Sequence, residues 1–112
     1  MTVYHLKSTS ILKDSNGNHV GTWVSNKHTI LFVHAKWCGY CKRTMPEFME
    51  AAKMSSAVNF ALMEDVVLKE MSQPLSVRGF PTFFLIDKDT GMVKEVNFPR
   101  ERTEMIAFIN KS

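Results

Sequence analysis

Cysteine is scarce in this sequence, and its two copies lie close together. Among 112 residues only Cys38 and Cys41 are cysteines, which excludes a scaffold held by several disulfides. A bridge between them would close a very short loop and constrain little of the unfolded chain. A chain of this length with 45% hydrophobic residues buries a core without such staples. The pair is therefore better explained by chemistry than by stability. We expect one domain over residues 1–112, in which residues 1–28 form a region whose structure the sequence leaves open.

Long apolar runs and dense clusters of one charge are also missing. No segment approaches the roughly 20 apolar residues that cross a bilayer, and residues 1–10 lack the apolar core of a signal peptide. We therefore expect no membrane partner and a cytoplasmic location. The alternative is a periplasmic or secretory compartment, reached with a leader since removed. The net charge of +3 includes no dense basic run, which argues against a nucleic-acid partner. We expect a monomer.

The sequence gives little support for a metal site as well. A single Cys-x-x-Cys supplies two of the four ligands that a structural zinc needs. The histidines are His5, His19, His28 and His34; only His28 and His34 have a ligand-like spacing, with five residues between them, and they precede the cysteine pair. Zinc binding is thus the weaker alternative use of the cysteine pair, and we expect no metal site.

The apolar pattern predicts strands that alternate with helices. Residues 29–35 are almost wholly apolar and include β-branched side chains, which is typical of a central strand covered on both faces. A helix is predicted at residues 39–54, with a kink at Pro46. Further strands are predicted at residues 3–6, 59–63, 82–86 and 92–98, and further helices at residues 66–72 and 103–110. This order indicates an α/β fold with a central mixed sheet of four or five strands and helices on both faces.

The turn signal around Asn16-Gly17 leaves two structures open. One is a hairpin between residues 11–12 and residues 20–24, since Asn-Gly favours tight hairpin turns. The other is a loop that leads to a short helix around Trp23.

The cysteine pair follows the predicted strand at residues 29–35 and opens the predicted helix. At a helix N-terminus, unpaired backbone N–H groups and aligned peptide dipoles both favour a thiolate over a thiol. The first cysteine of such a pair points outward, and the second lies about one turn further along and is more buried. We therefore expect Cys38 to attack a disulfide and Cys41 to resolve the mixed disulfide.

Two segments resemble the same known family. Residues 35–42, Ala-Lys-Trp-Cys-Gly-Tyr-Cys-Lys, look like the active-site segment of thioredoxins and protein disulfide isomerase domains. Pro46 matches the proline that kinks the family's active-site helix. Residues 77–82, Val-Arg-Gly-Phe-Pro-Thr, look like the family's cis-proline loop. The resemblance covers the chain from about residue 29 to its end, and it implies a thioredoxin fold.

The resemblance also implies which residues surround the cysteines. It implies that Pro81 is cis and faces the dithiol, that the peptide before it can hydrogen-bond an extended substrate, and that its ring discourages metal capture. The residues implied to line the substrate surface are Trp37, Gly39, Tyr40, Gly79 and Phe80. No cofactor is expected beyond the redox-active Cys38–Cys41 pair.

The chain departs from the family at two positions near the dithiol. Thioredoxins carry a buried Asp, and disulfide isomerase domains a Glu, at the position that is Phe32 here. Since that carboxylate takes the proton of the resolving thiol, resolution by Cys41 is expected to be slower or to use water. His34 stands where thioredoxins usually place a Trp. We hypothesise that His34 tunes the dithiol; the alternative is a histidine that merely packs at a strand end.

These features predict a thiol–disulfide oxidoreductase that acts on protein or peptide disulfides. We expect the reductase direction, with a more oxidising isomerase or oxidase as the alternative. A non-catalytic binding module on the same fold is disfavoured because both cysteines are present. An unidentified redox partner must reset the dithiol after each turnover.

Overall fold

A mixed sheet of five strands organises the chain. The computed structural model describes residues 2–23 and 25–111. The strand order is β1-β5-β4-β6-β7. In chain order the strands are β1 (Val3–His5), β4 (Thr29–His34), β5 (Asn59–Glu64), β6 (Thr82–Ile86) and β7 (Val93–Val96). The pairs β1–β5 and β5–β4 are parallel, while β4–β6 and β6–β7 are antiparallel. The expected mixed sheet is confirmed.

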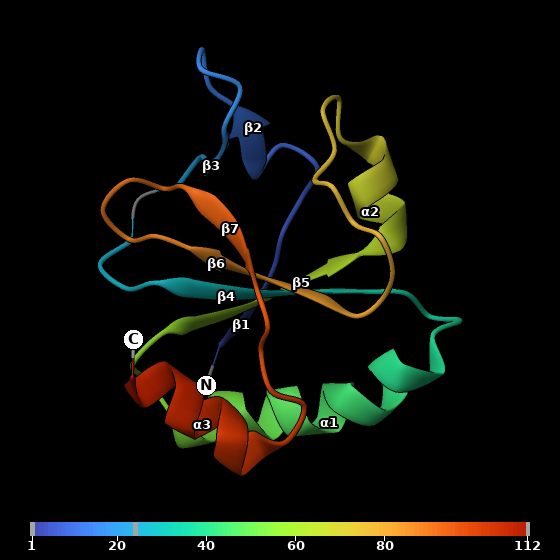
Figure 1. Cartoon of the computed structure of the whole chain (residues 1–112), viewed down its shortest axis with the longest axis vertical. Coiled ribbons are helices and arrows are strands. Elements are labelled where there is room, and N and C mark those ends of the chain that lie inside the picture. Colours follow the sequence, from blue (N-terminus) through green and yellow to red (C-terminus); the bar gives the residue numbers. More distant parts are fainter. Residues whose placement is uncertain (1, 24, 112) are drawn as a thin grey trace.

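Helices cover both faces of this sheet, as Figure 1 shows. The helices α1 (Gly39–Met54) and α3 (Arg102–Asn110) pack together on one face, and α2 (Asp65–Glu70) lies on the other. The central strand β4 alternates between the two layers. Ile30 and Phe32 belong to the apolar cluster under α1 and α3, whereas Leu31 and Val33 belong to the cluster under α2. All four side chains are at most 1% exposed, which explains why the segment reads as almost continuously apolar.

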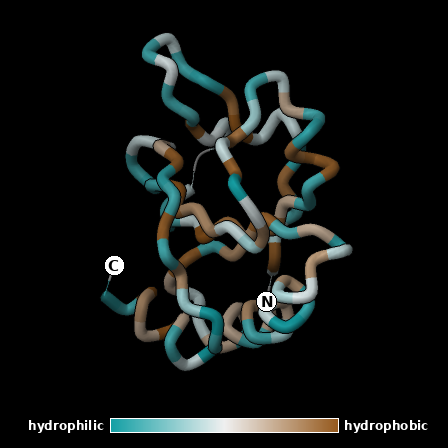
Figure 2. Tube along the Cα trace, turned by 45° about the vertical axis from the view of Figure 1, so that its right-hand side comes forward, coloured by the Kyte–Doolittle hydropathy of each residue, from teal (hydrophilic) through white to brown (hydrophobic). Residues whose placement is uncertain are grey.

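The N-terminal region forms the hairpin rather than the helix. Strands β2 (Ile11–Lys13) and β3 (His19–Gly21) pair antiparallel. Their turn is held by Asp14, whose carboxylate accepts hydrogen bonds from the N–H groups of residues 16 and 18, and by Gly17, whose φ is +82°. The hairpin projects from the sheet (Figure 1) and its tip is hydrophilic (Figure 2). Residue 24, at the end of the predicted second strand, lies outside the described residues.

The other predicted helices and strands differ from the observed ones only in the residues at which they begin or end. The predicted helix at residues 39–54 coincides with α1. The predicted helix at 66–72 begins one residue earlier and ends at Glu70, because Met71 turns to an extended conformation and is buried. Strand β7 is shorter than the predicted 92–98. None of the helices in the described part of the chain is long and apolar enough to cross a membrane.

An ion pair joins the two helices that share a face. The Glu47 carboxylate, on α1, accepts hydrogen bonds from the Arg102 backbone N–H (3.1 Å), Nε (3.2 Å) and Nη2 (2.6 Å). Arg102 is the first residue of α3, and the residue before it provides no side-chain cap. Glu47 therefore caps α3 from a neighbouring helix. These hydrogen bonds hold the pKa of Glu47 at about 2, below its ordinary value of 4.5.

We expect Glu47→Gln to lower the midpoint of thermal unfolding at pH 7. Because the folded-state pKa of Glu47 is depressed to about 2, its contribution is complete above the unfolded pKa near 4.5 and is lost as the pH falls toward 2. The melting temperatures of wild type and variant, measured by circular dichroism from pH 7 to pH 2, should therefore converge in acid. Glu95→Gln, an exposed change on β7, is the control. A gap that persists unchanged at pH 2 would contradict this role.

Candidate active site

The dithiol lies where β4 gives way to α1. Cys38 is the N-cap of α1, with an extended backbone conformation. Its Sγ accepts a hydrogen bond from the Cys41 N–H at 3.1 Å, and its own N–H bonds the carbonyl of Ala35 at 3.1 Å. The sulfur thus takes the place of the oxygen that usually caps a helix. An N–H donor and the positive end of the helix dipole both favour negative charge on that sulfur.

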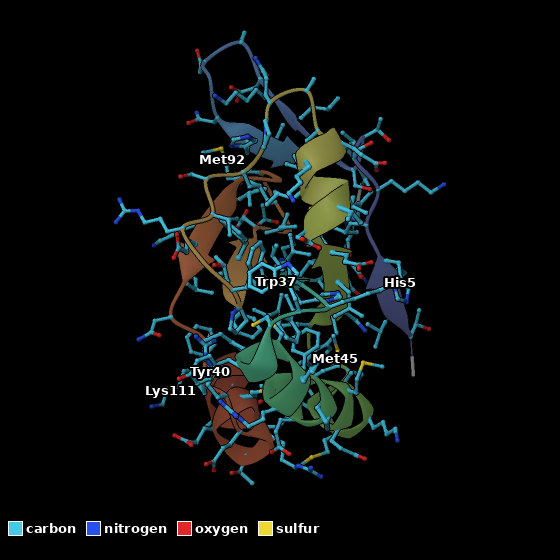
Figure 3. The ribbon with its side chains drawn as sticks, turned by 90° about the vertical axis from the view of Figure 1, so that its right-hand side faces the viewer. His5, Trp37, Tyr40, Met45, Met92 and Lys111 are labelled. Atoms are coloured by element: carbon cyan, nitrogen blue, oxygen red, sulfur yellow. The ribbon has the colours of Figure 1, made fainter. Side chains whose placement is uncertain are left out.

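Both cysteines are free thiols, and both are buried. Cys38 is 5% exposed and Cys41 is 2% exposed, so the expected difference in exposure is small. Two large aromatic side chains stand out beside them: Trp37 is 71% exposed and Tyr40 is 69% exposed. Figure 3 shows these two side chains on one face, near the start of α1. The sulfurs are therefore recessed between exposed rings.

The proline loop meets the dithiol as the resemblance implies. The Phe80–Pro81 peptide bond is cis, and the Cys38 Sγ lies 3.5 Å from the Phe80 carbonyl oxygen, to which the thiol donates. The Phe80 ring packs edge-on against Trp37, with centroids 5.5 Å apart. Trp37 in turn donates its Nε1–H to the Asp65 carboxylate at 3.3 Å. The sequence reasoning missed Asp65, whose only signal was an acidic residue at the start of a predicted helix.

The two glycines of the expected substrate surface lie open. Gly39 is the first residue of α1, and Gly79 precedes Phe80 in the proline loop; both are exposed. Neither has a positive φ, and an added Cβ at either position would meet no atom within 4 Å. Internal packing and backbone conformation therefore do not require glycine at these positions.

The environment of Cys41 is apolar. Burial, followed by the hydrogen bond with Cys38, raises the pKa of the Cys41 thiol to about 11. Cys41 shares its apolar cluster with Phe32, which is fully buried and stacks on Phe83 with centroids 4.8 Å apart. Phe48 packs edge-on against Phe32 at 5.1 Å. An aromatic ring thus occupies the position of the carboxylate that relatives would place there.

His34 stands at the end of β4, where the sequence placed it. Its ring packs against Phe32 with centroids 5.6 Å apart. Burial lowers the pKa of His34, and the nearby Glu64 and Asp65 carboxylates oppose that shift only in part. Within residues 2–23 and 25–111, no hydrogen bond joins His34 to either cysteine. Its role in the dithiol chemistry stays a prediction.

Metal and cofactor sites were also expected to be absent. Over the described residues, no three His, Cys, Asp or Glu side chains are grouped so as to hold a metal ion. The expectation that only the cysteine pair carries redox chemistry stays a prediction.

A groove of about 960 Å³ opens beside the proline loop. One wall is the first turns of α1, and the other is formed by the proline loop and the segment before α3. Its lining residues are Tyr40, Arg43, Thr44, Glu47, Gly79, Phe80, Pro81, Thr82, Arg100 and Glu101. Sequence reasoning missed the charged members of this set, because they come from segments more than 50 positions apart.

The fold and the recessed Cys-x-x-Cys beside a cis-proline define a thioredoxin-type domain. The Thioredoxin family model matches residues 10–111, and the chain belongs to the thioredoxin family. It is 30% identical over 106 residues to a protein disulfide-isomerase of Oryctolagus cuniculus, a match that covers 90% of this chain and 20% of the relative. It is also 39% identical over 64 residues to a probable protein disulfide-isomerase ER-60 of Schistosoma mansoni, covering 55% of the chain and 13% of that protein.

Solved structures agree on the fold. Thioredoxin f from spinach chloroplast superposes with a TM-score of 0.68 at 20% identity, over 98% of this chain and 85% of that one. By contrast, the chain spans about a fifth or less of the length of the disulfide-isomerases it matches. The likeness to those proteins therefore concerns one of their segments.

The raised pKa of Cys41 leads to a labelling prediction. In the reduced native protein at pH 8, iodoacetamide should modify Cys38 and leave Cys41 unmodified, because a thiol with a pKa of about 11 is almost wholly protonated there. Mass spectrometry after proteolysis separates the two sites. After denaturation both cysteines should react, which serves as the control that the reagent is active toward each of them. Equal labelling of both cysteines in the native state would contradict the assignment.

Because the pKa of His34 is lowered, we expect its positive charge to affect the reactivity of Cys38 at acidic pH only. Because burial lowers the pKa of His34 below its usual value, His34 is neutral at pH 8 and its cation forms only in acid. We expect His34→Gln to leave the rate of Cys38 alkylation unchanged at pH 8 and to lower it only in acid. Alkylation rates from pH 5 to pH 8 test this, with His19→Gln on the distant hairpin as control. A rate change of equal size at pH 8 would exclude an effect of the imidazolium.

Proposed function

We propose that this chain is a thiol–disulfide oxidoreductase that acts on protein or peptide disulfides. The observation that carries the proposal is the position of the Cys38 sulfur. It caps α1 at 3.1 Å from the Cys41 N–H and lies 3.5 Å from the Phe80 carbonyl, next to the cis-proline. A nucleophilic sulfur thus faces the backbone of a loop that an extended substrate can join.

The reaction is an exchange of two electrons in two steps. The Cys38 thiolate attacks one sulfur of a substrate disulfide; a Cys38–substrate disulfide forms, the substrate disulfide breaks, and one substrate thiolate leaves and takes a proton. The Cys41 thiol then loses its proton, and its thiolate attacks the Cys38 sulfur. The second substrate thiolate leaves, so the substrate is reduced and the Cys38–Cys41 disulfide is formed. Each step runs in reverse when the chain donates its disulfide.

The surroundings of the dithiol suit a polypeptide substrate. Trp37 and Tyr40, which are neighbours of the cysteines in the chain, offer exposed aromatic surface, and such surface contributes strongly to contacts between proteins. Gly39 and Gly79 leave open space that their own neighbours do not fill. A substrate backbone can therefore approach closely at both places.

Within this function we favour isomerisation over the reductase direction predicted from the sequence; thioredoxins and isomerase domains both carry the carboxylate that Phe32 replaces, so the preference rests on how slowly Cys41 can resolve the mixed disulfide. In the free dithiol, burial and the hydrogen bond with Cys38 raise the pKa of Cys41 to about 11; in the mixed disulfide the contribution of the Cys38 thiol is gone, and burial, the largest cause, still raises the pKa of Cys41. The aromatic Phe32 offers no proton acceptor in the cluster around it. The second step is then slow, so the mixed disulfide persists and other substrate thiols have time to attack it. The similarity to disulfide-isomerases supports the same direction.

The compartment follows from that chemistry. Disulfide rearrangement proceeds where disulfides persist, in oxidising compartments such as the endoplasmic reticulum. The disulfide-isomerases among the relatives do not support the cytoplasmic location expected from residues 1–10. We therefore favour the secretory alternative. The partner that resets the dithiol would be a thiol or disulfide of the same compartment.

The reductase and isomerase directions separate in one set of measurements. We expect a Cys38–Cys41 reduction potential near the −180 mV of isomerases, rather than the about −270 mV of thioredoxin, measured in glutathione buffers. Relative to the uncatalysed reactions, the chain should accelerate the reactivation of scrambled ribonuclease more than it accelerates the reduction of insulin. The rate of Cys41 resolution should rise about tenfold per pH unit from pH 6 to pH 9, because the thiolate fraction does.

Cysteine variants provide the controls. Cys41→Ser should trap the mixed disulfide as a covalent complex on non-reducing gels, and Cys38→Ser should trap none. Resolution that is independent of pH between 6 and 9 would mean that a base near Cys41 removes the proton. If neither substrate reacts and no complex forms, the chain is a binding module and the proposed activity is wrong.

A further inference from the structure

Two arginines line the groove beside the proline loop, and neither has a carboxylate partner. Arg43 lies on α1, five positions after Cys38, and Arg100 precedes α3. Both side chains are exposed. Over residues 2–23 and 25–111, the six ion pairs involve neither of them. Each guanidinium therefore keeps hydrogen-bond donors available at the groove.

Aromatic rings hold both guanidinium groups in place. The Arg43 Cζ lies 4.6 Å from the centroid of the Tyr40 ring, and the Arg100 Cζ lies 5.1 Å from that of Phe83. Arg100 also donates Nη1–H to the Phe98 carbonyl at 3.3 Å. Stacking leaves the edge of a guanidinium open for a carboxylate, to which it binds with two parallel hydrogen bonds. The side chains thus lose little freedom when an anion binds.

The carboxylates of the same groove leave it cationic. Glu47 is already neutralised, because both of its oxygens accept from Arg102. Glu101 is exposed and remains the one opposing charge among the lining residues that the structure describes. Two free arginines against one free carboxylate give the groove a net positive charge.

The rest of the dithiol face adds to this charge. The acidic residues near Trp37 are engaged: Glu64 pairs with Lys36 at 3.8 Å, and Asp65 with Lys69 at 4.0 Å. Lys42 and Arg78, which flank the cysteines and the proline loop, have no such partner within the described residues. A face with this excess attracts anionic segments before contact is made.

We propose that this groove selects disulfide substrates that carry Asp or Glu close to the reacting cysteine, with Arg43 and Arg100 as the specificity-determining residues. The proposal rests on the oxidoreductase function proposed above and names its substrate class. Five helical residues advance about 7.5 Å along α1, and an extended substrate advances about 3.3 Å per residue. The acidic residue that reaches Arg43 is therefore about two positions from the substrate cysteine.

The test uses peptides that differ in one charge. Three peptides carry a cysteine activated as a 2-pyridyl disulfide, with Glu, Gln or Lys two positions away on both sides. Cys38 attacks the peptide sulfur and releases neutral pyridinethione, which is followed by absorbance in a single turnover of the prereduced protein. Each rate is divided by the rate with dithiothreitol, a neutral thiol, so that intrinsic differences between the peptides cancel.

The expected order of normalised rates is Glu, then Gln, then Lys. Arg43→Gln and Arg100→Gln should each reduce the Glu-to-Gln ratio by about two- to fivefold, the range of exposed ion pairs, and the double variant should bring it close to one. Glu101→Gln should raise the ratio. Lys13→Gln removes the same charge from the distant hairpin and should leave it unchanged. Added salt should shrink the ratio in wild type and leave it unchanged in the double variant.

Two failures are distinguishable. If all three peptides react at equal normalised rates, or if the double variant keeps the full preference, the groove does not select acidic substrates, while the oxidoreductase function stands. If no peptide reacts with the protein although all react with dithiothreitol, the proposed function itself is wrong.

Discussion

The N-cap of α1 is the constraint on which the active site depends. Cys38 closes the first turn of the helix with its sulfur, and the Cys41 N–H it receives at 3.1 Å would otherwise lack a partner in the chain. The helix begins there because β4 ends there, and β4 is held in place by apolar layers on both faces. The burial of one strand therefore positions the nucleophile, and the proline loop reaches it from β6, the antiparallel neighbour of that strand.

The same burial determines how the site handles protons. Phe32 lies on the face of β4 that packs under α1, in one cluster with both cysteines. An aromatic ring there stacks on Phe83, packs edge-on against Phe48 and strengthens the core, but it gives Cys41 no base. The chain thus combines a sulfur at a helix N-cap, which accepts the Cys41 N–H, with a second sulfur whose pKa burial raises to about 11. In the proposed reaction, that contrast would separate attack from release in time.

Local patterns predicted most of the fold and the chemical core of the site. Neighbours in the chain are enough to predict the apolar strand β4, the helix that follows it and the turn at Asn16-Gly17. The turn signal left open whether the turn joins two strands of a hairpin or leads to a short helix. The resemblance implied that the proline loop faces the dithiol, and the contact between Cys38 and the Phe80 carbonyl, 42 positions away, lies in that loop. Contacts such as Glu47 with Arg102, 55 positions apart, and Trp37 with Asp65, 28 positions apart, follow from how helices and loops pack. No local pattern of charges or apolar residues specifies that packing.

In the proposed reaction, the groove and the buried Cys41 thiol would act on the same intermediate. A mixed disulfide that outlives the first step gives the contacts beside it time to matter, because a substrate held only by its sulfur would sample many orientations. An acidic side chain bound to Arg43 or Arg100 would keep one orientation of the chain against the proline loop. The other thiols of that substrate would then approach the Cys38 sulfur from a restricted set of directions. Under the proposed function, the charges of the groove would bear on which disulfide forms next, as well as on which substrate is attacked first.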